Sequence, residues 1–99
     1  MNRRVLIVDD ERLARQRLKH LLASHPNVSV VGEAADLAAA RLVIKEQQPN
    51  VVFLDIHLSP GDGFDLLPAL PAETAVVFQI VDRENSIRTI TFHTRTNDF

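Results

Sequence analysis

The stretch that decides the fold is VVFLDIHLSPGDGF, residues Val51–Phe64. Its four leading apolar residues run into a lone acid, Asp55, and a turn rich in glycine and proline follows. A short apolar run bounded by turn residues predicts a strand that is covered on both faces of a sheet. A second such run, Val5–Val8, ends in the acidic pair Asp9 and Asp10. Two buried strands therefore end in carboxylates, and these acids need an explanation beyond the fold.

The rest of the chain alternates between strand-like and helix-like segments. Helical spacing follows Asp10 and returns after Asp36, whose carboxylate can accept from the free N–H groups of a first helical turn. The expected strands cover residues 5–8, 28–34, 51–54 and 75–81, and further short helices are expected over 64–70 and 84–92. The side chains expected to face the core are Leu13, Leu18, Leu21 and Leu22 in the first helix, and Ala38, Leu42 and Val43 in the second. This alternation predicts right-handed βαβ units in an α/β fold with a parallel sheet.

Composition limits the function classes. The 99 residues suit a single domain, and 45% apolar residues are enough for a core. A net charge of −2 gives no basic surface for nucleic acid, and the lack of cysteine excludes disulfides and thiolate metal sites. No apolar run approaches the ~20 residues that span a bilayer. We expect a cytoplasmic segment that binds neither membrane nor nucleic acid itself.

The acids predict a metal site. In an open parallel sheet, ligands bind beyond the carboxyl ends of the strands, so Asp9, Asp10 and Asp55 would converge there if their strands are neighbours. Three carboxylates repel one another unless a cation neutralises them, and Mg²⁺ prefers such oxygen ligands. Beside Mg²⁺, the isolated Asp55 suits a nucleophile toward phosphorus, and the adjacent pair suits metal binding. The simpler interpretation is that these acids end strands, with Asp10 capping the first helix.

Several segments together carry a family resemblance: VLIVDDERLARQRLKHLL, VVGEA, VVFLDIHL, GDGFDLL and AVVF. Jointly they resemble the receiver domain of bacterial two-component response regulators, most closely the receivers of the LytTR-type (LytR/AlgR-like) family. The resemblance covers Arg4–Phe78 well and residues 87–92 weakly. It implies a flavodoxin-like fold over residues 1–99, with a parallel sheet in the order 2-1-3-4-5 flanked by helices. It further implies a signalling domain and not an enzyme.

Matched position by position, the resemblance implies that Asp55 is the phosphoacceptor. Asp9 and Asp10 would hold Mg²⁺ together with Asp55, and His57 would offer its backbone carbonyl to the metal. Gly63 would shape the turn after the third strand. The implied phosphate donor is a sensor histidine kinase, and the implied longer parent protein carries a DNA-binding effector domain for transcription regulation.

The chain departs from the family pattern at its C-terminal end. By alignment on AVVF, Ile80 occupies the position of a family Thr or Ser whose hydroxyl binds the phosphoryl group, and the sequence has no lysine after Lys45 to pair with that group. We therefore expect a receiver that is truncated or divergent after about residue 78, lacking the fifth strand and helix. Switching would then be impaired. The fourth strand would be an exposed edge that invites pairing between copies in a homodimer.

Two alternatives are open at this point. One is a pseudo-receiver, an interaction module that keeps the fold without control by phosphorylation. The other is a Mg²⁺-dependent phosphohydrolase with an aspartate nucleophile. It is disfavoured because enzymes of the haloacid-dehalogenase type need a second acid two residues after the nucleophile, and His57 stands there. The remaining histidines, His20, His25 and His93, are expected on the surface. The basic side chains of the first helix are expected to form a solvated face: Arg12, Arg15, Arg17 and Lys19.

Overall fold

The computed structural model describes residues 2–55, 68, 70, 74–81 and 87–93. Within them, one five-stranded sheet has the order β2-β1-β3-β4-β5. The elements in chain order are β1 (Arg3–Val8), α1 (Arg12–Leu22), β2 (Val28–Ala34), α2 (Leu37–Gln47), β3 (Val51–Asp55), β4 (Ala75–Val81) and β5 (Ile87–His93). The predicted order 2-1-3-4 of a flavodoxin-like parallel sheet is confirmed for the first four strands.

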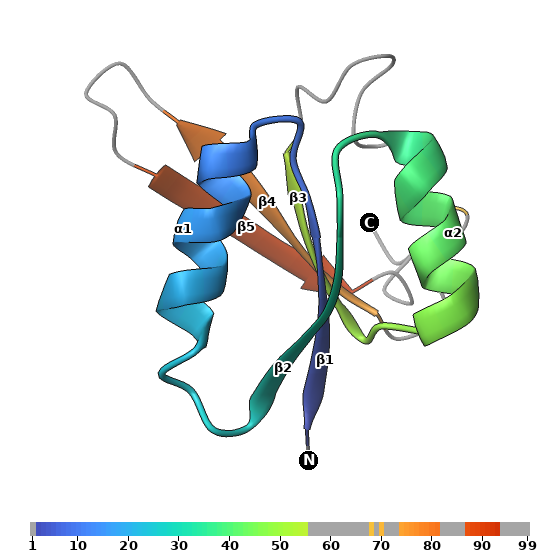
Figure 1. Cartoon of the computed structure of the whole chain (residues 1–99), viewed down its shortest axis with the longest axis horizontal. Helices are drawn as coiled ribbons and strands as arrows, with labels where there is room; N and C mark the ends of the chain where they lie inside the picture. Colours follow the sequence, from blue (N-terminus) through green and yellow to red (C-terminus); the bar gives the residue numbers. More distant parts are fainter. Residues whose placement is uncertain (1, 56–67, 69, 71–73, 82–86, 94–99) are drawn as a thin grey trace.

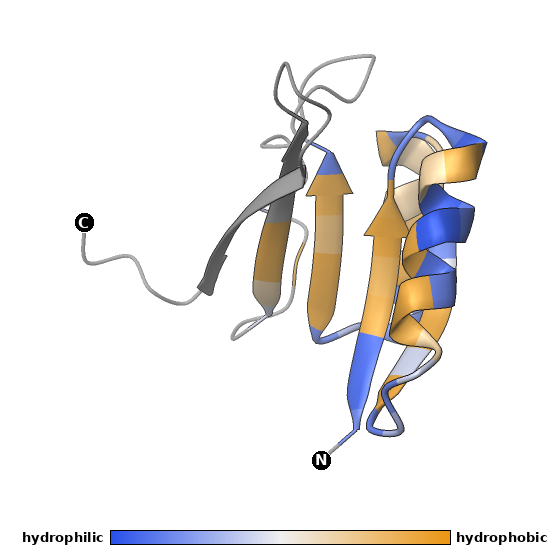
Figure 2. Cartoon of the chain, turned by 90° about the vertical axis from the view of Figure 1, so that its left-hand side faces the viewer, coloured by the Kyte–Doolittle hydropathy of each residue, from blue (hydrophilic) through white to orange (hydrophobic). Residues whose placement is uncertain are grey.

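The two central strands, β1 and β3, hold the core together. Val5 to Val8 are all at most 1% exposed, and Val52 and Leu54 are fully buried. Their alternating side chains supply both faces of the sheet, which is why a continuous apolar run was needed. Figure 2 shows both strands as hydrophobic over most of their length, with hydrophilic residues at the start of β1 and at the tip of β3. The polar residues of this region are thereby confined to the edges of the sheet.

Helices α1 and α2 flank the sheet on opposite sides (Figure 1). The Asp36 carboxylate caps α2 as predicted, because it accepts from the Ala39 N–H at 2.8 Å. The buried side chains of α2 are Leu37, Ala40 and Ile44. Val43 packs partly buried against them, but the prediction for Ala38 and Leu42 was wrong, since both are exposed. The face of α2 that packs on the sheet is the row of residues that begins at Leu37, directly after the capping residue Asp36.

The inward face of α1 also differs from the prediction. Leu18 and Leu22 pack against the core as expected, whereas Leu13 and Leu21 are 65% and 56% exposed. Together with Leu18 and Leu22, two basic residues, Arg15 and Lys19, complete the i, i+3, i+4, i+7 row that faces the sheet. They occupy this row because an acid on the sheet, Glu33, pairs with both of them. The leucine stripe read from the sequence was therefore partly wrong.

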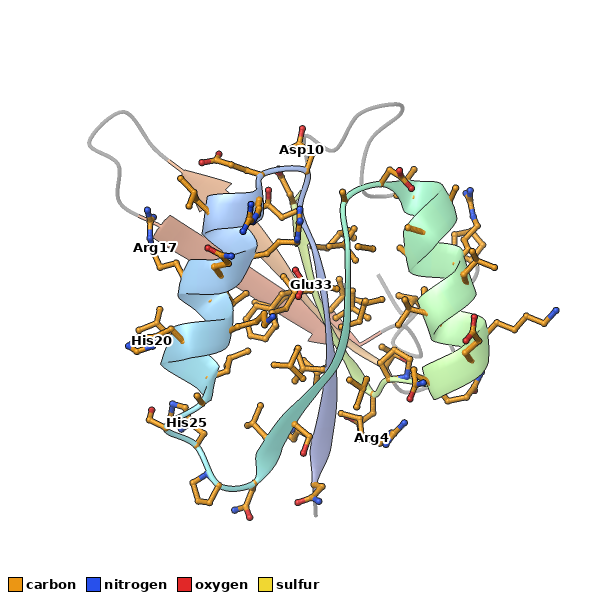
Figure 3. All side chains as sticks on the ribbon, in the orientation of Figure 1. Arg4, Asp10, Arg17, His20, His25 and Glu33 are labelled. Carbon is orange, nitrogen blue, oxygen red and sulfur yellow. The ribbon has the colours of Figure 1, made fainter. Side chains whose placement is uncertain are left out.

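A β-bulge in β2 places that acid. The parallel register pairs Val5 with Val30 and then Leu6 with Gly32, so one residue, Val31, is skipped. Val30 packs in the core cluster on the α1 side, and without the bulge Glu33 would point to the other face. Instead it lies between α1 and the sheet, as Figure 3 shows. The bulge thus re-aims one charged side chain.

The last strand contradicts a prediction. Residues 84–92 were expected to include a helix, but Ile87–His93 forms β5, antiparallel to β4, with Val81 opposite Ile87 and Ala75 opposite His93. Its alternating β-branched and apolar residues suit a strand better than a helix. The expectation that β4 would be an exposed edge was also wrong, since β5 pairs along its whole length. The short helix expected over residues 64–70 falls mostly outside the described residues.

Candidate functional site

Asp9, Asp10 and Asp55 meet at the carboxyl edge of the sheet. β1 and β3 are parallel neighbours with Val8 opposite Leu54, so the residues that follow, Asp9 and Asp55, stand side by side. Carboxylate oxygens of the three acids all lie within 4.8 Å of one another. Asp10 projects at the end of β1 (Figure 3). The convergence expected from the sequence is therefore present in the structure.

The three acids differ in exposure. Asp9 is buried, at 8% exposure, Asp55 is half-buried, and Asp10 is exposed. Asp9 is also the most tightly held: its Oδ1 accepts from the Glu11 N–H at 2.9 Å, and its own N–H donates to the Ala34 carbonyl at 3.0 Å. The acid that hydrogen-bonds to the start of α1 is therefore Asp9, and the residue before that helix, Glu11, makes no side-chain cap. The simpler interpretation of Asp10 as the cap was wrong.

Burial raises the pKa of Asp9, and the negative charges of Asp55, Asp10 and Glu11 raise it further, against the lowering effect of the Glu11 N–H. A buried carboxylate close to two others is costly in the ionised state. A divalent cation would remove this repulsion, and carboxylate oxygens at this spacing are the ligands that Mg²⁺ takes. The donor set therefore fits a hard divalent ion.

A second layer of contacts lies behind Asp9. The Arg15 guanidinium donates from Nη1 to the Asp9 carbonyl at 2.8 Å and from Nε to Glu33 Oε1 at 2.9 Å. Lys19 Nζ donates to the other Glu33 oxygen at 2.7 Å. The sequence interpretation assigned Arg15 to a solvated helix face and gave Glu33 no role. The signal that could have found them is an acid inside a strand and two basic residues four apart on the helix before it.

The other residues singled out from the sequence fall into two groups. His20 and His25 are exposed, as predicted (Figure 3). The others, His57 and Gly63, lie outside the described residues. No described helix is long and apolar enough to cross a membrane.

Comparison with known proteins defines the class. The response regulator receiver domain model matches residues 5–98, so the chain belongs to this family. It is 50% identical over 66 residues to the sensory transduction protein LytT of Enterococcus faecalis, covering 67% of this chain and 27% of that protein. Over 91 residues it is 36% identical to a protein-glutamate methylesterase/protein-glutamine glutaminase of Thiobacillus denitrificans, covering 88% of this chain and 26% of that protein. The resemblance to receivers with LytT-like relatives is confirmed.

Solved structures agree with this assignment. The receiver domain of Thermotoga maritima CheB superposes with a TM-score of 0.71 at 34% identity, covering 79% of this chain and 60% of that one. The receiver of the putative regulator NarL from Mycobacterium tuberculosis gives 0.69 at 35% identity, covering 78% and 64%. The chain spans about a quarter of the length of the two curated relatives. What their further domains do is therefore a property of those proteins.

Proposed function

We propose that the chain is a phosphoacceptor receiver in which Asp55 accepts a phosphoryl group from a sensor histidine kinase. Asp9, Asp10, Asp55 and the His57 backbone carbonyl would hold the Mg²⁺ ion. The single observation that carries this proposal is the meeting of three carboxylates at the carboxyl edge of parallel β1 and β3. Membership of the receiver family supports it, because phosphoryl acceptance on such an acid is general to that family.

In this reaction a carboxylate oxygen of Asp55 attacks phosphorus. The bond between phosphorus and the donor's imidazole nitrogen breaks, its electron pair stays on that nitrogen, and an aspartyl phosphate forms. A bound Mg²⁺ would supply charge neutralisation for the phosphoryl oxygens. The chain itself holds Asp9 in place through the Glu11 N–H and leaves Asp55 half-buried, open to a donor from the edge of the sheet.

In this proposal, accepting a phosphoryl group and responding to it by a change of conformation depend on different residues. Ile80 in the hydroxyl position removes one of the groups that would contact the phosphate. With fewer contacts that differ between the two states, phosphorylation shifts a conformational equilibrium less. The same observation favours the second candidate, a pseudo-receiver that binds partners without control by phosphate.

The wider setting follows from the same proposal. Residues 1–99 form one receiver domain in the cytoplasm, divergent after about residue 78, within a longer parent that carries a DNA-binding effector. Its identity to LytT of Enterococcus faecalis supports a sensory role for that parent. The receiver is a signalling domain and has no catalytic turnover of its own, and a homodimer is one assembly in which it would act.

Two measurements test this proposal. Beryllofluoride with Mg²⁺ should shift backbone amide resonances around Asp9 and Asp55 and leave those of β5 unchanged. Shifts that reach β5 would contradict lost switching, and no shifts at all would favour the pseudo-receiver. Labelling with acetyl phosphate should disappear in Asp55→Asn. It should persist in Asp36→Asn, which changes an equivalent carboxylate outside the site and keeps an oxygen for the Ala39 N–H.

A further inference from the structure

Arg15 joins three elements at one point. It belongs to α1, donates to the carbonyl of Asp9 after β1, and donates to Glu33 of β2, at 2.8 and 2.9 Å. Its side chain is only 14% exposed. An arginine can make both contacts at once because its N–H groups lie in one rigid plane. The guanidinium thus ties the backbone of the candidate metal site to the neighbouring strand.

The contacts around Glu33 fix that guanidinium in turn. The β-bulge at Val31 turns Glu33 toward α1, and both of its oxygens are used, one by Arg15 and one by Lys19. Lys19 is one helical turn after Arg15, so the two cations approach the same carboxylate from one helix face. An ion pair as exposed as Lys19–Glu33, whose side chains are 43% and 35% exposed, adds little to stability. Because Arg15 also contacts the Asp9 carbonyl, these contacts indicate a role at the acidic site.

We propose that Arg15 is a positioning residue that sets the Mg²⁺ affinity and selectivity of the acidic site by holding the Asp9 backbone. This inference rests on the proposed function, since it takes Asp9 as a ligand. With its carbonyl bound by Arg15 and its N–H bound by the Ala34 carbonyl, Asp9 has little freedom to move. Its carboxylate, already held by the Glu11 N–H, then meets the ion at a fixed place.

A role of Arg15 through its charge and a role through positioning predict opposite changes in Mg²⁺ affinity when Arg15 is removed. A positive guanidinium near a cation site repels the cation, so removing it should tighten Mg²⁺ binding if Arg15 acts only through its charge. If Arg15 acts by positioning, removing it should weaken binding, as the loss of groups that orient metal ligands typically does. The sign of the change therefore separates the two roles.

A second difference comes from the metal. Mg²⁺ demands near-ideal octahedral geometry, whereas Ca²⁺ accepts flexible arrangements at longer distances. Loosening Asp9 should therefore weaken Mg²⁺ binding much more than Ca²⁺ binding. A change in charge alone would alter the binding of both divalent ions in the same direction and to a similar degree.

The experiment is calorimetric titration of Mg²⁺ and Ca²⁺ into Arg15→Met, Arg15→Lys, Glu33→Gln and Arg17→Met. Arg15→Met should weaken Mg²⁺ about tenfold and Ca²⁺ by less than about threefold. Arg15→Lys, which keeps the charge but loses the double contact, should weaken Mg²⁺ by about threefold, as should Glu33→Gln. Arg17→Met is the matched control, because Arg17 is exposed on the outer face of the same helix (Figure 3). It should leave Mg²⁺ affinity within about twofold.

Unchanged or tighter Mg²⁺ binding by folded Arg15→Met would overturn the proposal, as would equal weakening for Mg²⁺ and Ca²⁺. Circular dichroism without metal establishes whether each variant is folded. If Arg15→Met is not folded, Arg15→Lys decides by the same two criteria, because it keeps the charge. Glu33→Gln, which removes a negative charge, decides only by the comparison of Mg²⁺ with Ca²⁺. Failure of the unmodified chain to bind Mg²⁺ would instead overturn the proposed metal site, and this inference with it.

Discussion

The sheet has two regions, residues 3–55 and residues 75–93, whose strands are connected and paired in different ways. In the first region, strands alternate with helices, β1 pairs in parallel with β2 and β3, and α1 and α2 flank the sheet on its two sides (Figure 1). In the second, β4 and β5 are consecutive strands that pair antiparallel. A parallel pair needs a long crossover, whereas an antiparallel pair forms between neighbours in the chain.

This difference bears on the site. Asp9, Asp10 and Asp55 all belong to the first region, where the strands end together at one edge. In the second region β5 runs back, so its last residue, His93, stands opposite Ala75 at the other edge of the sheet. A parallel fifth strand would instead have ended beside the acids. The three acids of the proposed metal site therefore lie together in the first region, and the antiparallel β5 of the second region ends at the opposite edge.

The largest effect should come from the core of the first region. Leu54→Ala removes a fully buried side chain next to Asp55, and we expect a loss of about 3 kcal/mol in the free energy of unfolding. Leu42→Ala is the control, because Leu42 is 61% exposed, and it should change this free energy by less than about 0.5 kcal/mol. Urea denaturation measures both, and similar losses would show that the core is placed wrongly.

Amide hydrogen exchange compares the two regions directly. Among the described residues, β1 is paired on both sides, whereas β5 pairs only with β4 at the end of the sheet. Within the same residues, α1 and α2 pack chiefly on β1 and β2. We expect the bonded amides of β5 to exchange at least about a hundredfold faster than those of β1. Equal protection in both strands would mean that the hairpin and the first region open as one cooperative unit.

Gly32→Ala tests the close approach of β2 to α2. A Cβ at Gly32 would lie 2.5 Å from Val43 Cγ1, so α2 or Val43 must move. The expected cost is about 2 kcal/mol in the free energy of unfolding, measured by denaturation. Adding Val43→Ala should recover part of this cost by making room. A double variant that loses the sum of the two single effects would contradict the contact.

Asp9→Asn should stabilise the chain in the absence of metal. Burial and the charges of the neighbouring acids raise the pKa of Asp9, so its ionised form is unfavourable at pH 7. Asparagine removes the charge and keeps an oxygen for the Glu11 N–H. We expect a gain of about 1 kcal/mol by thermal denaturation in a chelator, and a smaller response to added Mg²⁺. A loss of stability in the chelator would contradict the electrostatic account.

The smallest effect concerns Glu33. Hydrogen bonds from Lys19 and Arg15 lower its pKa below the ordinary 4.5, so the group stabilises the folded chain at pH values above 4.5. This contribution is lost as the pH falls through the lowered folded-state pKa. Glu33→Gln should therefore cost about 0.5 kcal/mol at pH 7 and almost nothing at the acid end of the titration. A cost independent of pH would show that charge is not the cause.

Local signals predicted much of the first region. The boundaries of β2 and β4 matched the prediction, and the cap at Asp36 followed from one residue and the free N–H groups beside it. The meeting of Asp9 and Asp55 also followed, since it depends only on two parallel strands being neighbours. β5 could not be predicted in the same way. Its β-branched residues favour a strand only weakly by themselves, and pairing with β4, which is not a local pattern, fixes the structure.

The sequence by itself determined the class of fold and the place of the acids, because short apolar runs and strand-ending carboxylates are local patterns. Only the tertiary structure decided which helix faces are buried, that Asp9 and not Asp10 is the buried acid, and that Arg15 reaches behind it. The physical reason for the last of these is the bulge at Val31. The bulge shifts the register of β2 by one residue, so Glu33 faces α1 and pairs with Arg15 and Lys19.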